Sequence, residues 1–509
     1  MFSEHIDRMQ VRSLGNLDRT IYPYYERDLR EGRYTEAQIR EFFACFFMQW
    51  ASINNYWGHP FYLGGTKADG TSEINKLSFL ILDVFDQLSI PTPKIQIKTA
   101  RNTPDAFLNK ALDMIRRGNN SLVFVSEDSI RRAMMGLGYS EETARTCDIR
   151  GCYEFTPRVH GNTTGAGHIN MLKPIELVFN NGTDPATGFR CECGAEPLEN
   201  IHSFDDFYTA YLKYLNNIIE TIVLCANDFE QYLHLINPAQ LYSITIENSL
   251  KTARDAFSDG NVYNNTSILC AGLGTAVDAL MAVREFVFRK RELTLAGFRD
   301  ILLRNWEGHE KLRLRILRSR KRYGNGDAGA DRYAAALGHF LGAKLNLRPN
   351  ARGGFYEASG HSARTFIRLG EKTGATPDGR RAGEEMSKNI SPAMGADVNG
   401  VTALIHSATA IDSSDLPGDF PLDVMMHPAT VQGEEGLAAM RALLHTYMDR
   451  HGIAIHFNIF DAAVLEDAQR NPEKYTGLQI RVCGWNVRFN DLCKKEQDAY
   501  IERARNIAE

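Results

Sequence analysis

One glycine near the end of the sequence constrains what this chain can fold into. Gly484 stands between an apolar, β-branched run and an aromatic run, in the stretch 478–492, LQIRVCGWNVRFNDL. Glycine lacks a Cβ, so it fits where backbone must come very close to other atoms. The apolar residues on both sides indicate that this close approach happens in a buried loop. The simplest interpretation of Gly484 is therefore a packing requirement.

A second interpretation of Gly484 is chemical. The Cα–H bond of a glycine is flanked by two amides, and loss of its hydrogen atom leaves a radical that is delocalised over both. No side chain prevents the radical centre from becoming planar, and burial protects it. Such a radical needs a partner cysteine elsewhere in the chain. A thiol suits the exchange because S–H and activated C–H bonds are close in strength.

The residues around Gly484 resemble the C-terminal signature of the glycyl radical enzymes, the pyruvate formate-lyase superfamily. The pattern that carries the resemblance is Arg481-Val482-x-Gly484-aromatic-x-x-x-Phe489-x-x-Leu492. The aromatic position is usually Tyr in that family and is Trp485 in this chain. Shorter matches lie at residues 353–355, 373–382, 391–392, 395–403 and 457–458.

Cys152 is the cysteine that fits the family's second loop. It follows Gly151 and lies two positions before Glu154. If this loop is extended, residues i and i+2 point the same way, so we expect the thiol and the carboxylate to face one cavity. Without the glycine motif, a small buried thiol beside a surface glutamate explains the pattern equally well. With the motif, Gly-Cys-x-Glu resembles the cysteine loop of glycyl radical eliminases and some decarboxylases. Tyr153 replaces the usual Val, and His456 replaces a common Gln.

The resemblance implies a radical elimination, either a dehydration or the cleavage of a C–N, C–S or C–O bond. Gly484 would store the radical, and Cys152 would become the thiyl that takes hydrogen from a small hydroxylated substrate. Glu154 would act as the general acid and base, deprotonating a hydroxyl beside the substrate radical. In the family's fold, an α/β barrel of ten strands in two five-stranded halves is surrounded by helices, and the two loops meet inside it.

The resemblance also implies how such a chain is activated. No cofactor is bound permanently and no metal site is expected, since the glycyl radical is installed after translation. The implied partner is a radical S-adenosylmethionine activating enzyme with a 4Fe–4S cluster. A homodimer is expected. We divide the chain into a pyruvate formate-lyase-like domain, 1–380, and a glycine radical domain, 381–509.

Two other reactions of the same family stay open. Arylacetate decarboxylases of the family also have Cys-x-Glu, so decarboxylation is an alternative to elimination. A formate acetyltransferase-like activity fits less well. Pyruvate formate-lyase proper has a Cys-Cys pair, whereas Cys152 is flanked by Gly151 and Tyr153.

Two further alternatives are not radical reactions. The region before residues 64–65 is shorter than in the family, so we expect either a compact member or a truncated reading frame. A truncated, inactive member would act as a scaffold. The other alternative is an unrelated α/β cysteine hydrolase that uses Cys152 with His160 or His168. A hydrolase would keep its activity when Gly484 is replaced by alanine.

Composition excludes several classes of partner. The chain has 509 residues, 43% of them hydrophobic and 24% charged, which is ordinary for a globular protein. A net charge of −5 gives no reason to expect binding to nucleic acid or to an anionic membrane. No run of eighteen apolar residues is present, and residues 1–8 lack the apolar core of a signal peptide. The nine cysteines are scattered and odd in number, so we expect reduced thiols in a cytoplasmic enzyme.

Local patterns predict alternating strands and helices, and hence an α/β class. Thr35 and Gln38 fit a helix-starting capping box. Further helices are predicted over 76–88, 104–117, 204–224 and 271–291, and strands over 91–98 and 121–125. The glycine-rich stretch 58–70 is predicted to be a loop.

Overall fold

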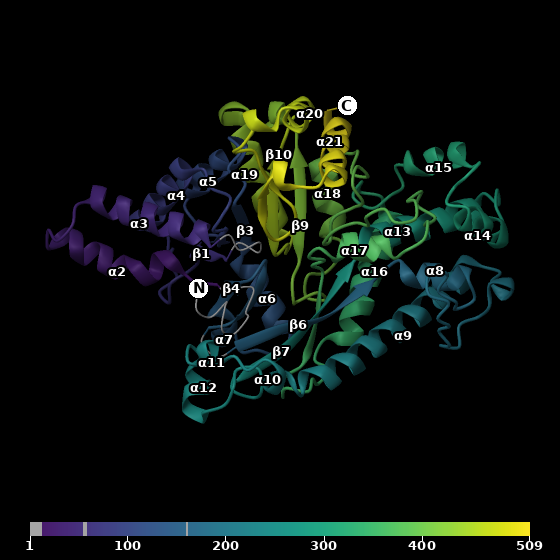
Figure 1. Cartoon of the computed structure of the whole chain (residues 1–509), viewed down its shortest axis with the longest axis horizontal. Coiled ribbons are helices and arrows are strands. Elements are labelled where there is room, and N and C mark those ends of the chain that lie inside the picture. Colours follow the sequence, from purple (N-terminus) through teal and green to yellow (C-terminus); the bar gives the residue numbers. More distant parts are fainter. Residues whose placement is uncertain (1–12, 54–58, 159–160, 509) are drawn as a thin grey trace. The chain divides into compact units, whose positions relative to one another are not determined.

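The computed structural model describes residues 13–53, 59–158 and 161–508 (Figure 1). The chain divides into two compact units, which we describe separately. Unit 1 contains Met1–Asn162, His234–Tyr263 and Pro421–Glu509, and unit 2 contains Thr163–Leu233 and Asn264–Phe420. Unit 1 therefore joins segments far apart in the sequence, including those that carry Cys152 and Gly484.

Unit 1 is built around a five-stranded sheet in the order β1-β2-β3-β10-β9. The strands are β1 (Phe61–Gly64), β2 (Ile95–Thr99), β3 (Leu122–Ser126), β9 (Pro421–Met426) and β10 (Ala454–Ile459). β1, β2 and β3 are parallel; β10 runs antiparallel to β3 and parallel to β9. Every residue of these five strands is buried. Such a sheet is typical of an α/β arrangement in which both faces are covered.

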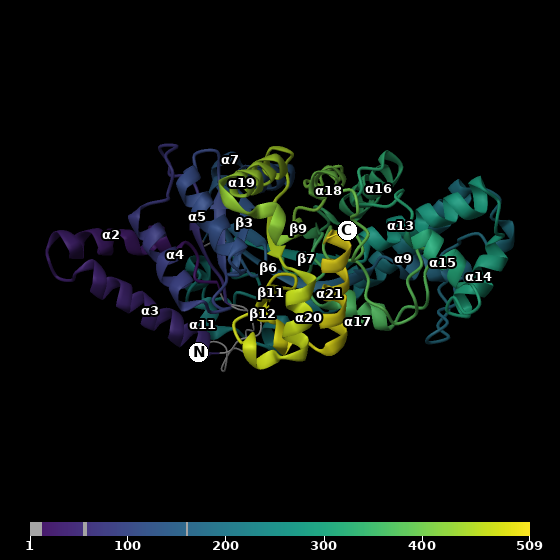
Figure 2. The same ribbon diagram turned by 90° about the horizontal axis from the view of Figure 1, so that it is seen from above.

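Helices surround this sheet. Those of unit 1 are α2 (Leu17–Arg30), α3 (Glu36–Ser52), α4 (Lys76–Leu88), α5 (Asp105–Arg116), α6 (Glu127–Gly136), α7 (Glu141–Arg145), α11 (Gln240–Ser243), α12 (Glu247–Thr252), α19 (Gly433–Asp449), α20 (Ala462–Arg470) and α21 (Lys494–Ala508). The short α10 (Leu233–Ile236) begins where unit 2 ends. α5 packs against α4, α19 and β10, and Figure 2 shows α5 and α19 side by side.

Two small antiparallel hairpins complete unit 1. One pairs β4 (Cys147–Arg150) with β5 (Glu154–Pro157), and the other pairs β11 (Gln479–Arg481) with β12 (Asn486–Arg488). The turn of the first, the Cys hairpin, holds Cys152. The turn of the second, the Gly hairpin, holds Gly484.

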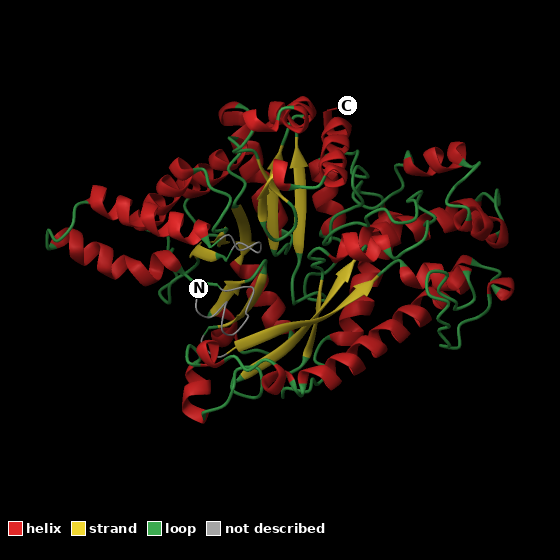
Figure 3. Ribbon diagram, in the orientation of Figure 1, coloured by secondary structure: helices red, strands yellow, loops and turns green. Residues whose placement is uncertain are grey.

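Unit 2 has a three-stranded sheet in the order β6-β7-β8, drawn in yellow in Figure 3. Its strands are β6 (Gly161–Asn170), β7 (Tyr263–Ala271) and β8 (Tyr356–Ser359). Its helices are α8 (Lys173–Phe179), α9 (Phe204–Glu230), α13 (Leu273–Val283), α14 (Leu295–Leu303), α15 (Glu310–Leu317), α16 (Ala328–Leu345), α17 (Thr365–Glu371) and α18 (Val401–Ala408). α13 and α16 pack together, and α8 packs against α9.

Most local predictions are confirmed. The capping box of Thr35 and Gln38 starts α3, and α4 spans the predicted 76–88. The α/β class is confirmed too, and unit 1 supplies one five-stranded sheet. Among the described residues, the sheet of unit 2 has three strands rather than five.

Two local predictions were wrong. Within the stretch 58–70, which is predicted to be a loop, Phe61–Gly64 form β1 because they pair with β2 at the edge of the sheet. The helix predicted over 271–291 begins only at Leu273, because Ala271 ends β7, and it changes to a π-helix over Arg284–Arg289.

No helix in the described part of the chain is both long enough and apolar enough to cross a membrane.

The core of unit 1 yields a stability prediction. Phe47 of α3 is 0% exposed and contacts the rings of Phe61 and Phe85. Phe47→Ala leaves a cavity, so we expect it to lower the free energy of unfolding by about 3–5 kcal/mol. Phe42, on the same helix, is 50% exposed, and Phe42→Ala serves as the matched control. Urea midpoints measure both variants; equal midpoints would contradict the packing described here.

Candidate active site

Cys152 lies in the turn of the Cys hairpin. The last pair of the hairpin joins Arg150 to Glu154, so Gly151, Cys152 and Tyr153 form the turn. Gly151 has a φ of +56°, in the left-handed region that glycine tolerates. The Cys152 side chain is 5% exposed. The hairpin thus presents a thiol in a buried turn.

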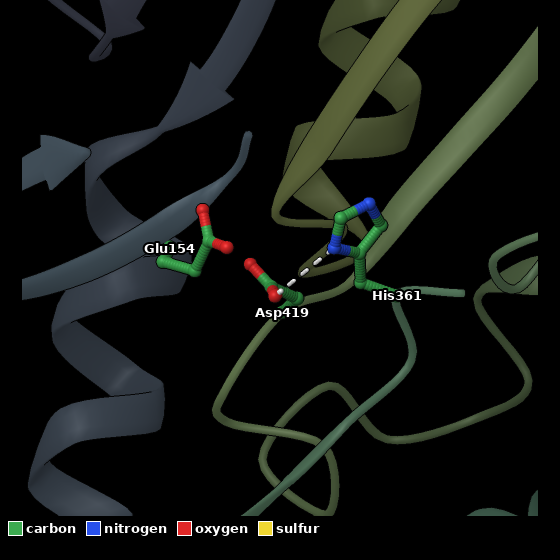
Figure 4. A group of neighbouring side chains, drawn as sticks. All are labelled: Glu154, His361 and Asp419. Atoms are coloured by element: carbon green, nitrogen blue, oxygen red, sulfur yellow. Dashed lines mark ion pairs between the residues drawn. The ribbon is translucent and has the colours of Figure 1, made fainter. Parts of the chain in front are cut away.

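Glu154 folds back over this turn. One oxygen of its carboxylate accepts hydrogen bonds from the backbone N–H groups of Cys152, at 2.5 Å, and Tyr153, at 3.0 Å. The prediction of an extended loop from Cys152 to Glu154 was therefore wrong, because the chain reverses at Gly151. The carboxylate still reaches the cysteine, but it does so by bending back. Glu154 stays half-buried, and Figure 4 shows its side chain.

Gly484 lies in the turn of the Gly hairpin. Arg481 pairs with Asn486, and the N–H of Val482 donates to the carbonyl of Trp485, which closes the turn. The side chains of Val482, Cys483 and Trp485 are all at most 3% exposed. The predicted burial of this loop is confirmed.

Asparagine side chains attach the Gly hairpin to the rest of unit 1. The Asn458 amide, on β10, donates to the carbonyl of Arg481 at 2.9 Å and accepts from its N–H at 3.0 Å. Asn120 donates to the carbonyl of Gln479, and Asn486 donates to the hydroxyl of Ser121. These contacts are polar and local, so they can be broken without opening the sheet itself.

The two hairpins meet at Gly484 and Cys152. A Cβ built on Gly484 would overlap both the Cβ and the Sγ of Cys152 and stand 3.3 Å from its Cα. Only glycine fits against the cysteine at this distance. The packing requirement inferred from the sequence is therefore real, and the atom it brings close to Gly484 is the thiol sulfur.

Lys94 is a residue of this site that the sequence analysis missed. Its Nζ donates to the carbonyl oxygen of Gly484 at 2.7 Å and lies 3.6 Å from the Sγ of Cys152. Lys94 is 0% exposed, and burial lowers the pKa of its ammonium, while the adjacent Cys152 works in the opposite direction. The buried nitrogen thus touches both halves of the site.

The strand that follows Lys94 holds the Cys hairpin from the same face. Gln96 donates to the carbonyl of Cys152 at 3.0 Å, and Lys98 donates to the carbonyl of Cys147 at 2.9 Å. Lys94, Gln96 and Lys98 alternate along the chain, so their side chains lie on one side of β2. Three polar residues at alternate positions in a buried strand were the signal that could have found Lys94.

Tyr153 and His456, which both depart from the family pattern, contact each other. The Tyr153 hydroxyl lies 3.1 Å from Nδ1 of His456, and Nε2 of His456 lies 2.9 Å from a carboxylate oxygen of Asp423. All three are buried, and burial raises the pKa of the Tyr153 phenol well above its ordinary value. Which of the Tyr153 hydroxyl and His456 Nδ1 donates in this contact depends on the tautomer of the imidazole. This chain of contacts fixes the residue after Cys152 against β9 and β10.

The histidines proposed for a cysteine hydrolase remain untested. His160 lies outside the described residues. His168 is on β6 of unit 2, and burial, with a contribution from Arg368, lowers its pKa to about 4. His168 is therefore neutral at pH 7.

Unit 2 also contains a buried histidine–carboxylate pair. Nδ1 of His361 lies 3.7 Å from a carboxylate oxygen of Asp419 (Figure 4). The hydroxyl of Ser359 donates to the same carboxylate at 3.1 Å. One imidazole and one carboxylate supply two of the four ligands that a typical zinc site needs, so this pair by itself is not a metal centre.

Two protein-family models match the chain, and between them they cover both hairpins. The family model described as pyruvate formate lyase-like matches residues 4–370, and the glycine radical model matches residues 386–490. Trans-4-hydroxy-L-proline dehydratase of Clostridioides difficile is 30% identical over 96% of this chain and 64% of its own length. This chain thus spans about 64% of that relative.

Solved structures agree with the sequence matches. A structure described for 1,2-propanediol dehydration in Roseburia inulinivorans superposes with a TM-score of 0.90 and 30% identity, over 96% of this chain and 64% of that one. The B12-independent glycerol dehydratase from Clostridium butyricum, with glycerol bound, gives a TM-score of 0.89 and 26% identity, over 96% of this chain and 63% of that one. Such neighbours have an α/β barrel, so the five-stranded sheet corresponds to part of that architecture.

If the Gly hairpin can undock, weakening its attachment should make the buried thiols of Cys152 and Cys483 react faster with an alkylating reagent. Asn458→Ala removes both contacts to Arg481, which we expect to cost about 1–2 kcal/mol of docking free energy. Alkylation of Cys152 and Cys483 would then be roughly five- to thirtyfold faster. Mass spectrometry after iodoacetamide treatment measures the rates, with the exposed Cys45 as internal reference.

The matched control for Asn458 is Asn346 of unit 2. Its amide bridges the backbone of Asp415 and Ala358 in the same two-sided way. Asn346→Ala is expected to leave the alkylation of Cys152 and Cys483 unchanged. An equal acceleration in both variants would mean that general destabilisation, not undocking of the hairpin, exposes the thiols.

Proposed function

Because the chain belongs to the pyruvate formate lyase-like family, we propose that it carries the catalytic centre of a glycyl radical lyase or dehydratase. Gly484 stores the radical, Cys152 forms the thiyl and Glu154 moves the proton. The observation that carries this proposal is the close approach of Gly484 to the sulfur of Cys152. A hydrogen atom has only a van der Waals distance to cross there, and no side chain stands in its way.

The proposed reaction is a sequence of hydrogen-atom transfers between Gly484, Cys152 and the substrate. The Gly484 radical takes the hydrogen of the Cys152 thiol, which leaves a thiyl, and the thiyl takes a hydrogen atom from a substrate C–H bond beside a hydroxyl. Glu154 accepts the hydroxyl proton, and the bond to the β-leaving group breaks, so that the leaving group departs with the bonding electron pair; Glu154 then returns the proton to the leaving group. The product radical takes hydrogen back from Cys152, and the thiyl restores the Gly484 radical.

The position of Glu154 supports its part in this scheme. Its carboxylate is held by the backbone N–H groups of Cys152 and Tyr153, so its orientation beside the thiol is set before substrate arrives. A carboxylate in this place serves elimination of water, an amine or sulfite.

We propose a small hydroxylated molecule as the substrate. The dehydratases that the chain resembles are named for hydroxyproline, propanediol and glycerol, all of which carry a hydroxyl. Cys152 has no neighbouring cysteine, so acyl transfer of the formate acetyltransferase type is disfavoured. Decarboxylation of an arylacetate and an inactive scaffold are the other outcomes that the experiments below distinguish.

The activation partner belongs to this proposal as well. A radical S-adenosylmethionine enzyme with a 4Fe–4S cluster would abstract hydrogen from Gly484, for which the Gly hairpin has to leave its buried position. The asparagine contacts of that hairpin are suited to such local undocking. A homodimer, a cytoplasmic location, and the division into domains 1–380 and 381–509 remain part of the proposal.

The radical is the first point to test. Anaerobic incubation with such an activating enzyme, S-adenosylmethionine and a reductant is expected to give an EPR doublet near the free-electron position, because one Cα–H proton remains on Gly484. Gly484→Ala should give no signal. Cys152→Ser, the matched control, removes turnover but keeps the doublet. Air should then cleave the chain at Gly484. A doublet that survives in Gly484→Ala would place the radical elsewhere.

The general base is tested separately. Glu154→Gln keeps the size of the side chain but accepts protons poorly, so we expect turnover to fall about 10²–10⁴-fold while the EPR doublet persists. Products are assayed with diols, amino alcohols, hydroxyproline and arylacetates. Full activity in Glu154→Gln removes this residue from the mechanism. Carbon dioxide released from an arylacetate would favour the decarboxylase. A radical without turnover of any of these compounds leaves elimination unsupported.

A further inference from the structure

We propose that Lys94 is a further catalytic residue of this site, which stabilises the Gly484 radical through its carbonyl oxygen and orients the Cys152 thiol. This inference deepens the proposed function and rests on it. It is carried by one geometric fact, namely that a single fully buried nitrogen contacts both the radical residue and the thiol.

The first contact acts on the radical itself. Unpaired spin on the Cα of Gly484 spreads over the two flanking amides, and the carbonyl is the electron-withdrawing side. The Nζ of Lys94 donates to that carbonyl oxygen at 2.7 Å, the length of a strong hydrogen bond. A donor at this oxygen draws more electron density into the carbonyl and so lowers the energy of the delocalised radical.

The second contact acts on the direction of the hydrogen transfer. The Nζ of Lys94 donates toward the sulfur of Cys152 at 3.6 Å and so occupies one of its lone pairs. The thiol hydrogen is then left to point along another direction of the sulfur. The Cα of Gly484 is the neighbour against which this sulfur packs. Lys94 therefore favours the rotamer that aims S–H at the radical centre.

A purely structural role explains this lysine less well. Burying an amine costs free energy unless it is hydrogen-bonded, and burial of the charged form costs more. An apolar side chain would fill the same space before β2 without that cost. Lys94 also lies near Arg481, a second buried cation, which works against its charged form. Burying an amine here costs free energy that packing alone does not require. The cost is explained if the amine is needed as a hydrogen-bond donor to the carbonyl of Gly484.

The first test requires no substitution. The chain is labelled with ¹⁵N-lysine, activated anaerobically and examined by electron–nuclear double resonance in H₂O and in D₂O. Spin on the carbonyl oxygen of Gly484 is expected to couple weakly to ¹⁵N and to one exchangeable proton besides those of the Cα–H and the flanking amides, because the donor lies at 2.7 Å. A sample that shows the glycyl doublet without both couplings overturns the inference.

The second test uses Lys94→Met, which keeps an unbranched chain but has no N–H. We expect the ¹⁵N coupling and the lysine proton coupling to vanish and the radical yield per chain to fall on the order of fivefold, the scale of one hydrogen bond. Exchange of the Gly484 Cα–H with D₂O through the Cys152 thiol should slow as well. A variant with the coupling of the unsubstituted chain refutes the proposal.

Lys98→Met is the matched control. Lys98 lies on the same side of β2 and bonds to the carbonyl of Cys147 without touching Gly484. Its substitution is expected to keep the coupling even if the chain becomes less stable. Identical spectra and yields for Lys94→Met and Lys98→Met would show that Lys94 only holds the hairpin.

Failure of the inference and failure of the proposed function give different results. An unsubstituted chain that forms no glycyl radical overturns the proposed function, and the role of Lys94 falls with it. A chain that forms the radical but shows no coupling to Lys94 overturns only the inference. If Lys94→Met does not fold, the ¹⁵N-labelled chain alone decides the question.

Discussion

The contact between Gly484 and Cys152 is the constraint on which the rest of unit 1 depends. It tolerates no Cβ on one side and requires a buried thiol on the other. Two segments far apart in the chain must meet with the accuracy of a van der Waals contact, and short hairpins alone cannot ensure this. The fully buried five-stranded sheet supplies a rigid frame to which both are attached.

The two hairpins are attached in different ways. The Cys hairpin is held by Gln96 and Lys98 of β2, an interior strand of the sheet, and its turn is closed by Glu154 and anchored through Tyr153. The Gly hairpin is held by asparagine contacts at Arg481 and Gln479, by the bond from Lys94 to Gly484 and by the burial of Trp485. Activation by a separate enzyme, as proposed, would require the contacts of the Gly hairpin to open while those of the Cys hairpin hold.

The sequence predicted the parts of the site that depend on residue type. Gly484, Cys152 and Glu154 were identified through the motifs that resemble the family, and α4 matches the helix predicted over 76–88. The missed parts depend on tertiary context. Alternating polar and apolar residues, as in β2, usually indicate a strand with one face in solvent. In this chain the polar face contacts the Cys hairpin instead, so Lys94 was not recognised as a site residue. β1 was missed because it lies in a glycine-rich stretch and is a strand only through its pairing with β2. β7 was missed because it begins with polar residues, among them Asn264 and Asn265.

The contact between Tyr153 and His456 has an evolutionary consequence. Both positions differ from the common family pattern, and their side chains bond to each other in the interior. A change at one position alone removes the shared hydrogen bond and leaves a buried polar group to be accommodated, whereas a change at both removes donor and acceptor together. The two sites are therefore epistatic. Relatives that have one of these residues are therefore expected to have the other.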